Sequence, residues 1–221
     1  MACIQGSESG QYTEMTTDCF DGNGGDDEIH AFLEILCDYI RNKEFCFTRE
    51  IDSTIYGGSG DDKIYGGSEL DLIYGNEGDD TIYGGDQRDT IFGGQDDDLI
   101  DGNEGKDILH GNRGNDTIEG GKHEDVIYGN EDNDVLWGED KDDTLYGGQG
   151  DDLLYGGDDE DYLYGNKGND TLDGGKGEDV LNGGSGADRL IGGGGADIFY
   201  VGSGDVVVDF DASEGDVIYY I

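Results

Sequence analysis

Aspartate recurs at every ninth residue through most of this chain. From Gly57 to Tyr200 the sequence divides into sixteen consecutive nine-residue repeats without an insertion, the first being GGSGDDKIY and the last GGGGADIFY. The first residue is Gly and the sixth is Asp in all sixteen. Evenly spaced carboxylates are hard oxygen ligands, so this series is suited to binding multivalent cations. The sixth-position aspartates are Asp62, Asp71, Asp80, Asp89, Asp98, Asp107, Asp116, Asp125, Asp134, Asp143, Asp152, Asp161, Asp170, Asp179, Asp188 and Asp197.

The fixed period predicts stacked coils, each covering the open core of its neighbour. Glycines at the first, second and fourth positions allow a tight turn with positive φ angles, and positions seven to nine predict a three-residue strand. The eighth residue, always Ile, Leu or Phe, then points inward. Two repeats complete one coil. The turns of odd-numbered repeats lie along one edge, and those of even-numbered repeats along the other. We expect an all-β parallel β-roll of about eight 18-residue coils.

Coil spacing identifies the cation. Equivalent aspartates lie one strand spacing apart, about 4.8 Å, where two charges repel by about 3 kcal/mol at an effective dielectric constant of 20. Calcium binds oxygen at about 2.3–2.6 Å, so ligands on opposite sides of one ion are separated by a similar distance. Asp62 with Asp80, and Asp71 with Asp89, are expected to share ions, up to about 14 in all. Backbone carbonyls complete the shell, notably at the fourth-position glycines Gly60, Gly78, Gly114, Gly150, Gly168 and Gly186.

Composition supports a cation-dependent fold. The chain has 55 Asp plus Glu against 12 Lys plus Arg, a net charge of −43, and only 33% apolar residues. Such a chain cannot offset its conformational entropy by burial alone and would be disordered without counter-charge. Nucleic acid is excluded as a partner because its phosphates would be repelled. No apolar stretch is long enough to predict a transmembrane segment.

Residues 1–56 predict a separate amino-terminal cap. GNGGDDEIH at 22–30 is one further nonapeptide, and AFLEILCDYIRN at 31–42 has apolar residues at helical spacing. We expect a short helix that covers the open end of the roll, with a partner-binding helix as the alternative. The four cysteines, Cys3, Cys19, Cys37 and Cys46, contain no C-x-x-C pair, which argues against zinc. Two disulfides are expected, with the pairing open; free thiols are the alternative.

The repeat resembles the glycine-rich nonapeptide GGxGxDxUx of the repeats-in-toxin (RTX) family, where U is a large apolar residue. The resemblance covers residues 57–200. It implies a right-handed parallel β-roll with calcium in its turns, in an extracellular protein exported by a bacterial type I secretion system and folding in external calcium. Residues 201–221 resemble the segment that follows such repeats, with a capping or secretion-signal role.

The fourth position departs from this pattern unequally. Odd-numbered repeats lack glycine there only at Asp96 and Asp132. Even-numbered repeats lack it at Glu69, Gln87, His123, Lys141 and Asp159. We therefore expect the even edge to bind fewer or weaker ions, since Lys141 would place a cation where an ion could sit.

No catalytic motif stands out. His123-Glu124 is not followed by a second histidine, no G-x-S-x-G is present, and the repeat phase of the carboxylates favours ion binding over acid–base work. We expect no enzyme. Outward residues of the even repeats, at positions seven and nine, carry no formal charge and could mediate self-association or bind a protein partner. The predicted function is an extracellular calcium-binding roll with a structural, adhesive or assembly role. The alternative is a folding and secretion module related to a secreted enzyme or toxin.

Overall fold

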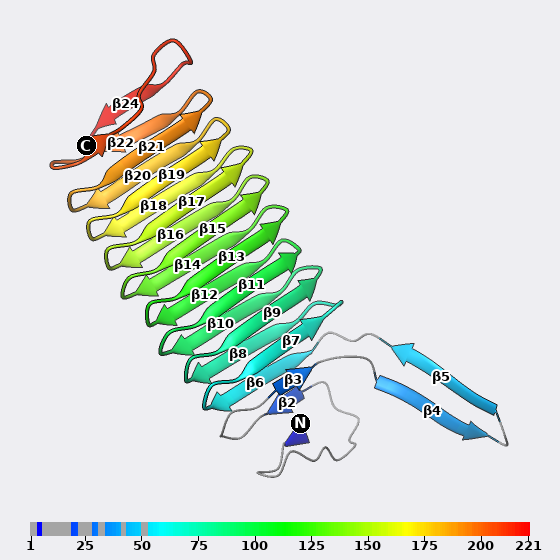
Figure 1. The fold of residues 1–221 in the computed structure, drawn as a ribbon. Helices are drawn as coiled ribbons and strands as arrows, with labels where there is room; N and C mark the ends of the chain where they lie inside the picture. Colours follow the sequence, from blue (N-terminus) through cyan, green and yellow to red (C-terminus); the bar gives the residue numbers. More distant parts are fainter. Residues whose placement is uncertain (1–3, 6–18, 22–27, 31–33, 41–42, 50–52) are drawn as a thin grey trace.

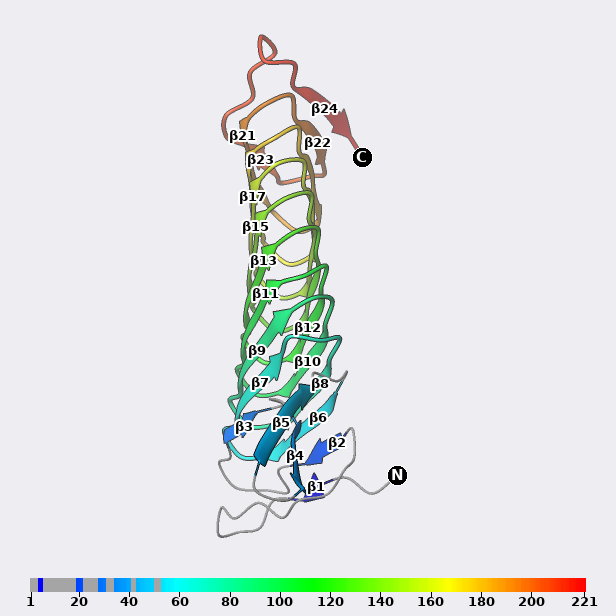
Figure 2. The same ribbon diagram turned by 90° about the vertical axis from the view of Figure 1, so that its right-hand side faces the viewer.

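Two parallel β-sheets face each other across a narrow core in the computed structural model, and the chain winds between them for about nine turns (Figure 1). The structure describes residues 4–5, 19–21, 28–30, 34–40, 43–49 and 53–221, with side chains from residue 53 onward. The view along the sheets shows how thin the layer between them is (Figure 2). No helix occurs in these residues.

Strands of the same sheet are two repeats apart in the sequence. Sheet A has the order β1 (Ile4–Gln5), β2 (Cys19–Asp21), β6 (Thr54–Ser59), β8 (Leu72–Glu77), β10 (Thr90–Gln95), β12 (Ile108–Arg113), β14 (Val126–Glu131), β16 (Thr144–Gln149), β18 (Tyr162–Lys167), β20 (Val180–Ser185), β22 (Ile198–Val201) and β24 (Val217–Tyr220). Sheet B has the order β23 (Val206–Val207), β21 (Arg189–Gly194), β19 (Thr171–Lys176), β17 (Leu153–Asp158), β15 (Val135–Asp140), β13 (Thr117–Lys122), β11 (Leu99–Glu104), β9 (Thr81–Asp86), β7 (Lys63–Gly67) and β3 (Glu28–His30). The predicted parallel β-roll is therefore confirmed.

The pairing register keeps every repeat in phase. Ile91 pairs with Ile73 on one side and Leu109 on the other, each 18 residues away. The strands are longer than predicted, because most run from position seven through position three of the next repeat, as in Thr90–Gln95. The prediction ended the strand at the first glycine, but the ladder continues past it to the pair Gln95–Glu77.

The eighth-position side chains form the core. All of them, from Ile64 to Phe199, have 0% exposure. The core begins one coil earlier than the sequence analysis placed it, since Ile55 is also fully buried and Ser53 occupies the sixth position. The backbone N–H of Ser53 donates to Asp71 Oδ1 at 2.7 Å. This repeat was missed because serine replaces its aspartate.

Glycine is required at the first position for steric reasons, and the expected positive φ angle there is wrong. Within the described residues, positive φ occurs at the second position of every repeat and at most fourth positions, but not at the first. A Cβ on Gly129 would instead collide with Asp134 Oδ2 and lie 2.7 Å from the carbonyl oxygen of Gly147 in the next coil. The first glycine thus makes room for the aspartate of its own repeat.

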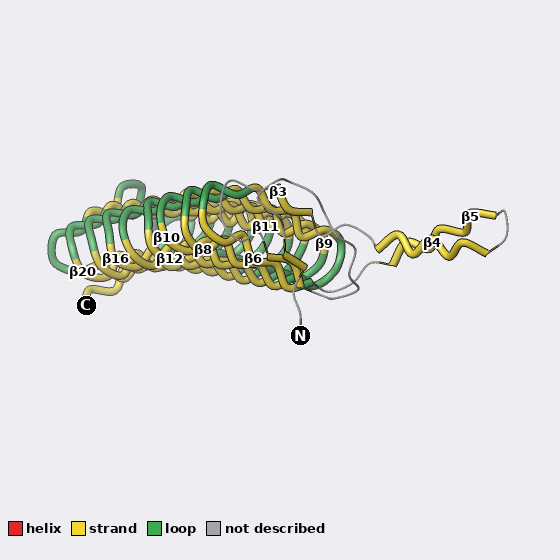
Figure 3. The backbone as a smooth tube through the Cα atoms, turned by 90° about the horizontal axis from the view of Figure 1, so that it is seen from below, coloured by secondary structure: helices red, strands yellow, loops and turns green. Residues whose placement is uncertain are grey.

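The predicted helix at 31–42 is wrong over residues 34–40, and residues 31–33 and 41–42 lie outside the described residues. Residues Glu34–Ile40 form strand β4, which pairs antiparallel with β5 (Lys43–Arg49) and projects away from the roll instead of covering its end (Figure 3). A short apolar run fits either period, and here a second β-prone run, KEFCFTR, follows at hairpin distance. The last three residues of the 22–30 nonapeptide form β3, which pairs with β7 as part of sheet B. Cys3, and the side chains of Cys19, Cys37 and Cys46, lie outside the described residues, so the cysteine pairing stays open.

The carboxyl-terminal segment continues both sheets. β23 pairs with β21, and β24 pairs with β22. Asp205 and Asp216 accept hydrogen bonds from the backbone N–H groups of Asp188 and Asp197, at 3.1 and 3.0 Å. The interaction made by the repeats therefore persists although the nonapeptide pattern has ended. Within the described residues, no helix is long and apolar enough to cross a membrane.

Replacing Gly129 with alanine should destabilise the roll by about 1–3 kcal/mol, because the new methyl group overpacks the space held by Asp134. Gly194→Ala is the matched control, since a Cβ there meets nothing within 4 Å and the backbone needs no positive φ. Urea unfolding at saturating calcium measures both. Equal stability of the two variants would contradict the steric account.

Candidate calcium sites along the two edges

The sixth-position aspartates form a buried ladder at each edge of the roll. Their exposure does not exceed 5%. In each coil the backbone N–H of the aspartate donates to Oδ1 of the aspartate 18 residues later, at 2.7–3.0 Å, as in Asp98 to Asp116 and Asp107 to Asp125. One carboxylate oxygen therefore fixes the register of the turns.

The second oxygen of these carboxylates has no hydrogen-bond partner. Oδ2 is buried and unpartnered in every sixth-position aspartate from Asp80 to Asp188. It lies over the first glycine of its own repeat, as Asp134 does over Gly129. Leaving a charged oxygen buried without a partner is costly, so each of these positions requires a cation or a proton.

Burial raises the pKa of the ladder carboxyls. The pKa of Asp143 rises to about 9, and those of Asp125 and Asp134 to about 8. Desolvation is the largest cause, neighbouring carboxylates add to it, and the hydrogen bond from the preceding coil acts in the opposite direction. Without a bound cation, the roll therefore holds its aspartates in a state that favours protonation near neutral pH.

Backbone carbonyls supply further oxygen ligands between the coils. All six predicted glycine positions, Gly60, Gly78, Gly114, Gly150, Gly168 and Gly186, have positive φ. A Cβ on Gly78 would collide with the carbonyl oxygen of Gly60, and one on Gly186 with that of Gly168. These carbonyls therefore point across the gap toward the next turn of the same edge, which is where calcium would use them.

The donor set fits calcium better than a softer metal. Within the described residues, no three His, Cys, Asp or Glu side chains converge as a metal site. A bound ion would therefore draw its ligands from buried Oδ2 atoms and turn carbonyls together, a mixture of hard oxygens that suits calcium. Sharing of one ion by Asp62 and Asp80, or by Asp71 and Asp89, stays a prediction.

The odd edge carries a second ladder that the sequence analysis missed. Fifth-position Asp and Asn side chains accept hydrogen bonds from the backbone N–H of the fifth residue one coil later, through Asp61, Asp79, Asp97, Asn115, Asn133, Asp151 and Asn169. On the even edge the backbone N–H of Glu160 donates the corresponding hydrogen bond to Asp142 Oδ1, at 3.2 Å. The sequence contains a pattern that could have predicted this ladder, since seven of the eight odd-numbered repeats have Asp or Asn at the fifth position.

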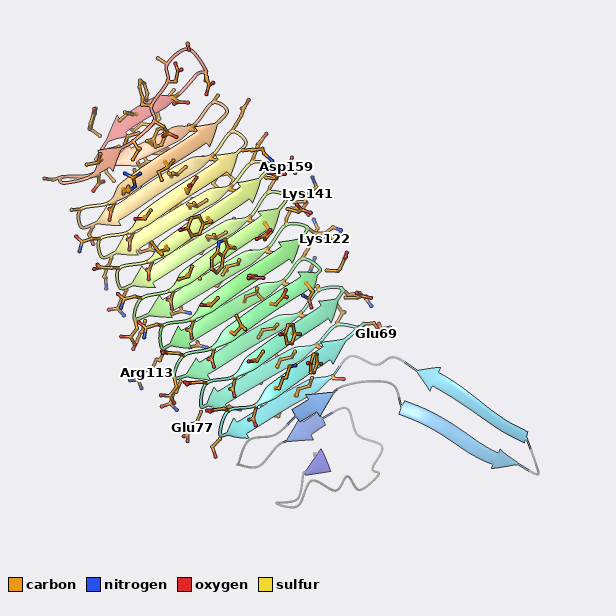
Figure 4. All side chains as sticks on the ribbon, viewed as in Figure 1. Glu69, Glu77, Arg113, Lys122, Lys141 and Asp159 are labelled. Atoms are coloured by element: carbon orange, nitrogen blue, oxygen red, sulfur yellow. The ribbon has the colours of Figure 1, made fainter. Side chains whose placement is uncertain are left out.

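The even edge carries ion pairs. Lys106 contacts Glu124 at 2.7 Å, Lys141 contacts Asp159 at 2.5 Å, Lys176 contacts Asp158 at 2.6 Å, and Lys122 contacts Glu104. Figure 4 places Lys122, Lys141 and Asp159 along this edge, opposite Arg113 and Glu77. The Lys141 amine thus lies on an exposed carboxylate of the next turn. His123 and Lys141 have φ angles of 82° and 92°. The turn therefore keeps its left-handed backbone conformation at these fourth positions although glycine is replaced.

Two of the shallow depressions among the described residues have volumes of about 450 and 400 Å³. Arg88, Lys106 and His123 line the first, and Asp101, Glu119 and Glu139 the second, together with neighbouring turn residues. Neither contains a serine, threonine or cysteine nucleophile beside a base. That the chain is not an enzyme stays a prediction.

Comparison with known proteins identifies the repeat. A family model described as the RTX calcium-binding nonapeptide repeat, built of four copies, matches residues 52–73, 68–100, 101–136, 137–172 and 173–208. These segments cover most of the chain and coincide with the coils that carry the aspartate ladders. No curated protein matches the sequence.

Acid should partly replace calcium. From Asp80 to Asp179 the ladder carboxyls have folded-state pKa values of about 6 to 9, above the ordinary value of 3.8, so the folded chain binds more protons than the unfolded chain. The contribution of these carboxyls to the stability of the calcium-free roll is therefore fully present below about pH 4 and is lost as the pH rises through about 6 to 9. Circular dichroism in chelator should show more β-sheet at pH 5 than at pH 8, with sedimentation excluding aggregation. Identical spectra would contradict the raised pKa values.

The two edges should respond differently to loss of one ladder charge. Asp116→Asn, on the odd edge, and Asp125→Asn, on the even edge, both keep the Oδ1 acceptor. Burial raises the pKa of both carboxyls. The positive charge of Lys106 lowers the pKa of Asp125, whereas the charges of Asp97 and Asp132 raise the pKa of Asp116. We expect Asp116→Asn to raise the calcium concentration at the folding midpoint more than Asp125→Asn does. The difference between the two variants should be only roughly threefold, since exposed charges interact weakly with the ladder carboxylates. An equal or larger shift for Asp125→Asn would remove the distinction between edges.

Proposed function

Because the chain belongs to the family of RTX calcium-binding nonapeptide repeat proteins, we propose that it is an extracellular protein whose roll folds when calcium fills the turns. The observation that carries this proposal is the row of buried, unpartnered Oδ2 atoms from Asp80 to Asp188. Each lies over the first glycine of its own repeat and requires a cation or a proton.

Charge explains why folding would depend on the ion. The chain has a net charge of −43, and folding brings its ladder carboxylates into the interior. About 14 calcium ions would contribute about +28 and reduce the net charge to about −15. Each ion also joins consecutive coils, so the binding free energy becomes folding free energy. Calcium binding thereby neutralises the ladder carboxylates and holds neighbouring coils together at the same time.

The same dependence fits export before folding. RTX repeats are typical of secreted bacterial proteins. A chain that remains unfolded where calcium is scarce can be exported through a type I system and then fold in an external medium that contains calcium. Residues 201–221 would contribute the secretion signal in this proposal.

An assembly role is supported by the outer face of sheet A. We define the sheet A stripe as the outward residues at positions seven and nine of the even-numbered repeats, from Leu72 to Tyr200. None carries a formal charge when His110 is neutral, and burial lowers the pKa of His110. Sheet B differs, with Lys63, Asp101, Glu119 and Arg189 among its outward residues. We propose that the stripe pairs with a second copy, because two neutral faces can meet while the charged turns remain outside.

Calcium titration tests the central proposal. The chelated protein should give a coil spectrum at pH 7.5 and change to β-sheet at roughly 0.1–1 mM calcium. Magnesium at the same concentration should be a poor substitute because it demands shorter bonds and a stricter octahedron. A complete β-sheet spectrum in excess chelator would contradict calcium-dependent folding.

Charge substitution tests the stripe. Tyr128→Lys with Tyr146→Lys places two like charges on neighbouring strands of the stripe, away from the ladder and the core. The double variant should still fold in calcium and should dissociate, as measured by light scattering. Trp137→Lys with Tyr155→Lys, which changes the stacked pair on sheet B, is the matched control. A monomeric parent, or an equally oligomeric double variant, would favour the alternative role as a folding and secretion module.

A further inference from the structure

Tyrosine rings on neighbouring strands of sheet A are stacked in parallel. Tyr128, Tyr146 and Tyr164 lie on β14, β16 and β18 in direct register. The centroids of the first two rings are 5.0 Å apart with 6° between their planes, and those of the second two are 5.0 Å apart with 10° between their planes. The roll thus holds three phenols in one row at the spacing of its coils.

Stacking determines which parts of these rings remain available. Tyr146 has a ring against each of its faces, so those faces cannot receive a planar ligand or a sugar. All three side chains are half-buried. The ring edges, with the phenol oxygens and the carbons ortho to them, are what the row of a single roll, not paired with a second copy, offers to solvent.

We propose that the row Tyr128, Tyr146 and Tyr164 is a site of oxidative cross-linking, in which a peroxidase and hydrogen peroxide join two neighbouring rings through a carbon–carbon bond.

The reaction balances with one peroxide for each cross-link. Two phenols each lose one electron and one proton and become phenoxyl radicals, while hydrogen peroxide accepts two electrons and two protons and becomes two waters. The radicals join at their ortho carbons. The hydrogen on each joined carbon is lost to solvent as a proton, and each phenol oxygen regains one. The cross-linked protein is therefore lighter by two hydrogens.

Position favours coupling between stacked tyrosines over coupling of unstacked ones. Two further pairs are stacked in the same way as this row, Tyr56–Tyr74 and Tyr65–Tyr83. Holding two phenols side by side replaces a bimolecular encounter by an intramolecular step, in which the stacked rings need only turn until their ortho carbons meet. Tyr162 provides the contrast, because it is 45% exposed on β18 yet pairs in register with Thr144 and Val180. On the other side, His110 stacks against Tyr128 at 4.6 Å and ends the run of tyrosines.

A cross-link in this row would lock the coils together. It joins residues 18 apart in the sequence and on adjacent strands, which closes a loop around one complete coil. Closing a loop lowers the entropy of the unfolded chain, as a disulfide does. The cross-linked coils should therefore keep more of their structure when calcium is removed. This consequence rests on the proposed calcium-dependent folding.

The experiment treats the calcium-bound protein with a haem peroxidase and hydrogen peroxide, followed by digestion and mass spectrometry. We expect peptides joined through Tyr128–Tyr146 or Tyr146–Tyr164, lighter by two hydrogens and formed within one chain. Tyr146→Phe should lower cross-linking of this row at least fivefold, since it removes the shared partner, while Tyr162→Phe should leave it unchanged. Cross-links that join mainly different chains, or that involve Tyr162 as often as Tyr146, would overturn the proposal.

A parallel reaction in chelator separates this proposal from the proposed function. If calcium controls folding, coupling of the row should fall in chelator, and protein cross-linked beforehand should retain more β-sheet after chelation. Unchanged coupling in chelator would overturn calcium-dependent folding but support the row as a cross-linking site. Absence of coupling in a calcium-bound roll with a full β-sheet spectrum would overturn the cross-linking proposal alone.

Discussion

The rest of this structure depends on one constraint. The repeats bury carboxylates in which only one of the two oxygens has a hydrogen-bond partner. From Asp80 to Asp188, Oδ1 of each ladder aspartate accepts a hydrogen bond from the backbone N–H of the preceding coil, which sets the register, while Oδ2 is buried without a hydrogen-bond partner. The first glycine of every repeat lacks a side chain because that oxygen occupies the space. Strand pairing, turn shape and the need for a cation therefore follow from the same residue.

The two sheets share this interior but not the surfaces they present. Core residues at the eighth position are equivalent on both sides, and all are fully buried. Outside, sheet A stacks uncharged rings from Tyr56 to Tyr164, whereas sheet B interrupts its rings with Asp101, Glu119 and Asp173. The edges differ as well, since the fifth-position ladder of Asp and Asn runs along the odd edge, whereas four of the five ion pairs among the described residues lie on the even edge. A uniform framework thus carries four distinct surfaces.

The repeat was enough to predict the roll, its core and the ladder aspartates, because three positions hold one phase over sixteen units. Prediction failed outside the repeats, and also where one residue type can be required for either of two physical reasons. Residues 34–40 fit helix and strand equally well, and the partner strand decided between them. The glycine at the first position was attributed to its freedom to adopt positive φ. A Cβ on Gly129 would collide with Asp134, which shows that glycine is required there because no side chain fits. Ser53, Asp205 and Asp216 extend the ladder outside the motif and could not be found from it.

The alternation of sheets has a consequence for how the length of such a chain can change. Gain or loss of 18 residues adds or removes one whole coil and leaves every later side chain on its original face. Gain or loss of nine residues would move all later repeats to the opposite sheet. Tyr128, Tyr146 and Tyr164 would then follow Asp101 and Glu119, and the lysines of one edge would join the acid and amide row of the other. Length variation in this protein is therefore expected to proceed by pairs of repeats.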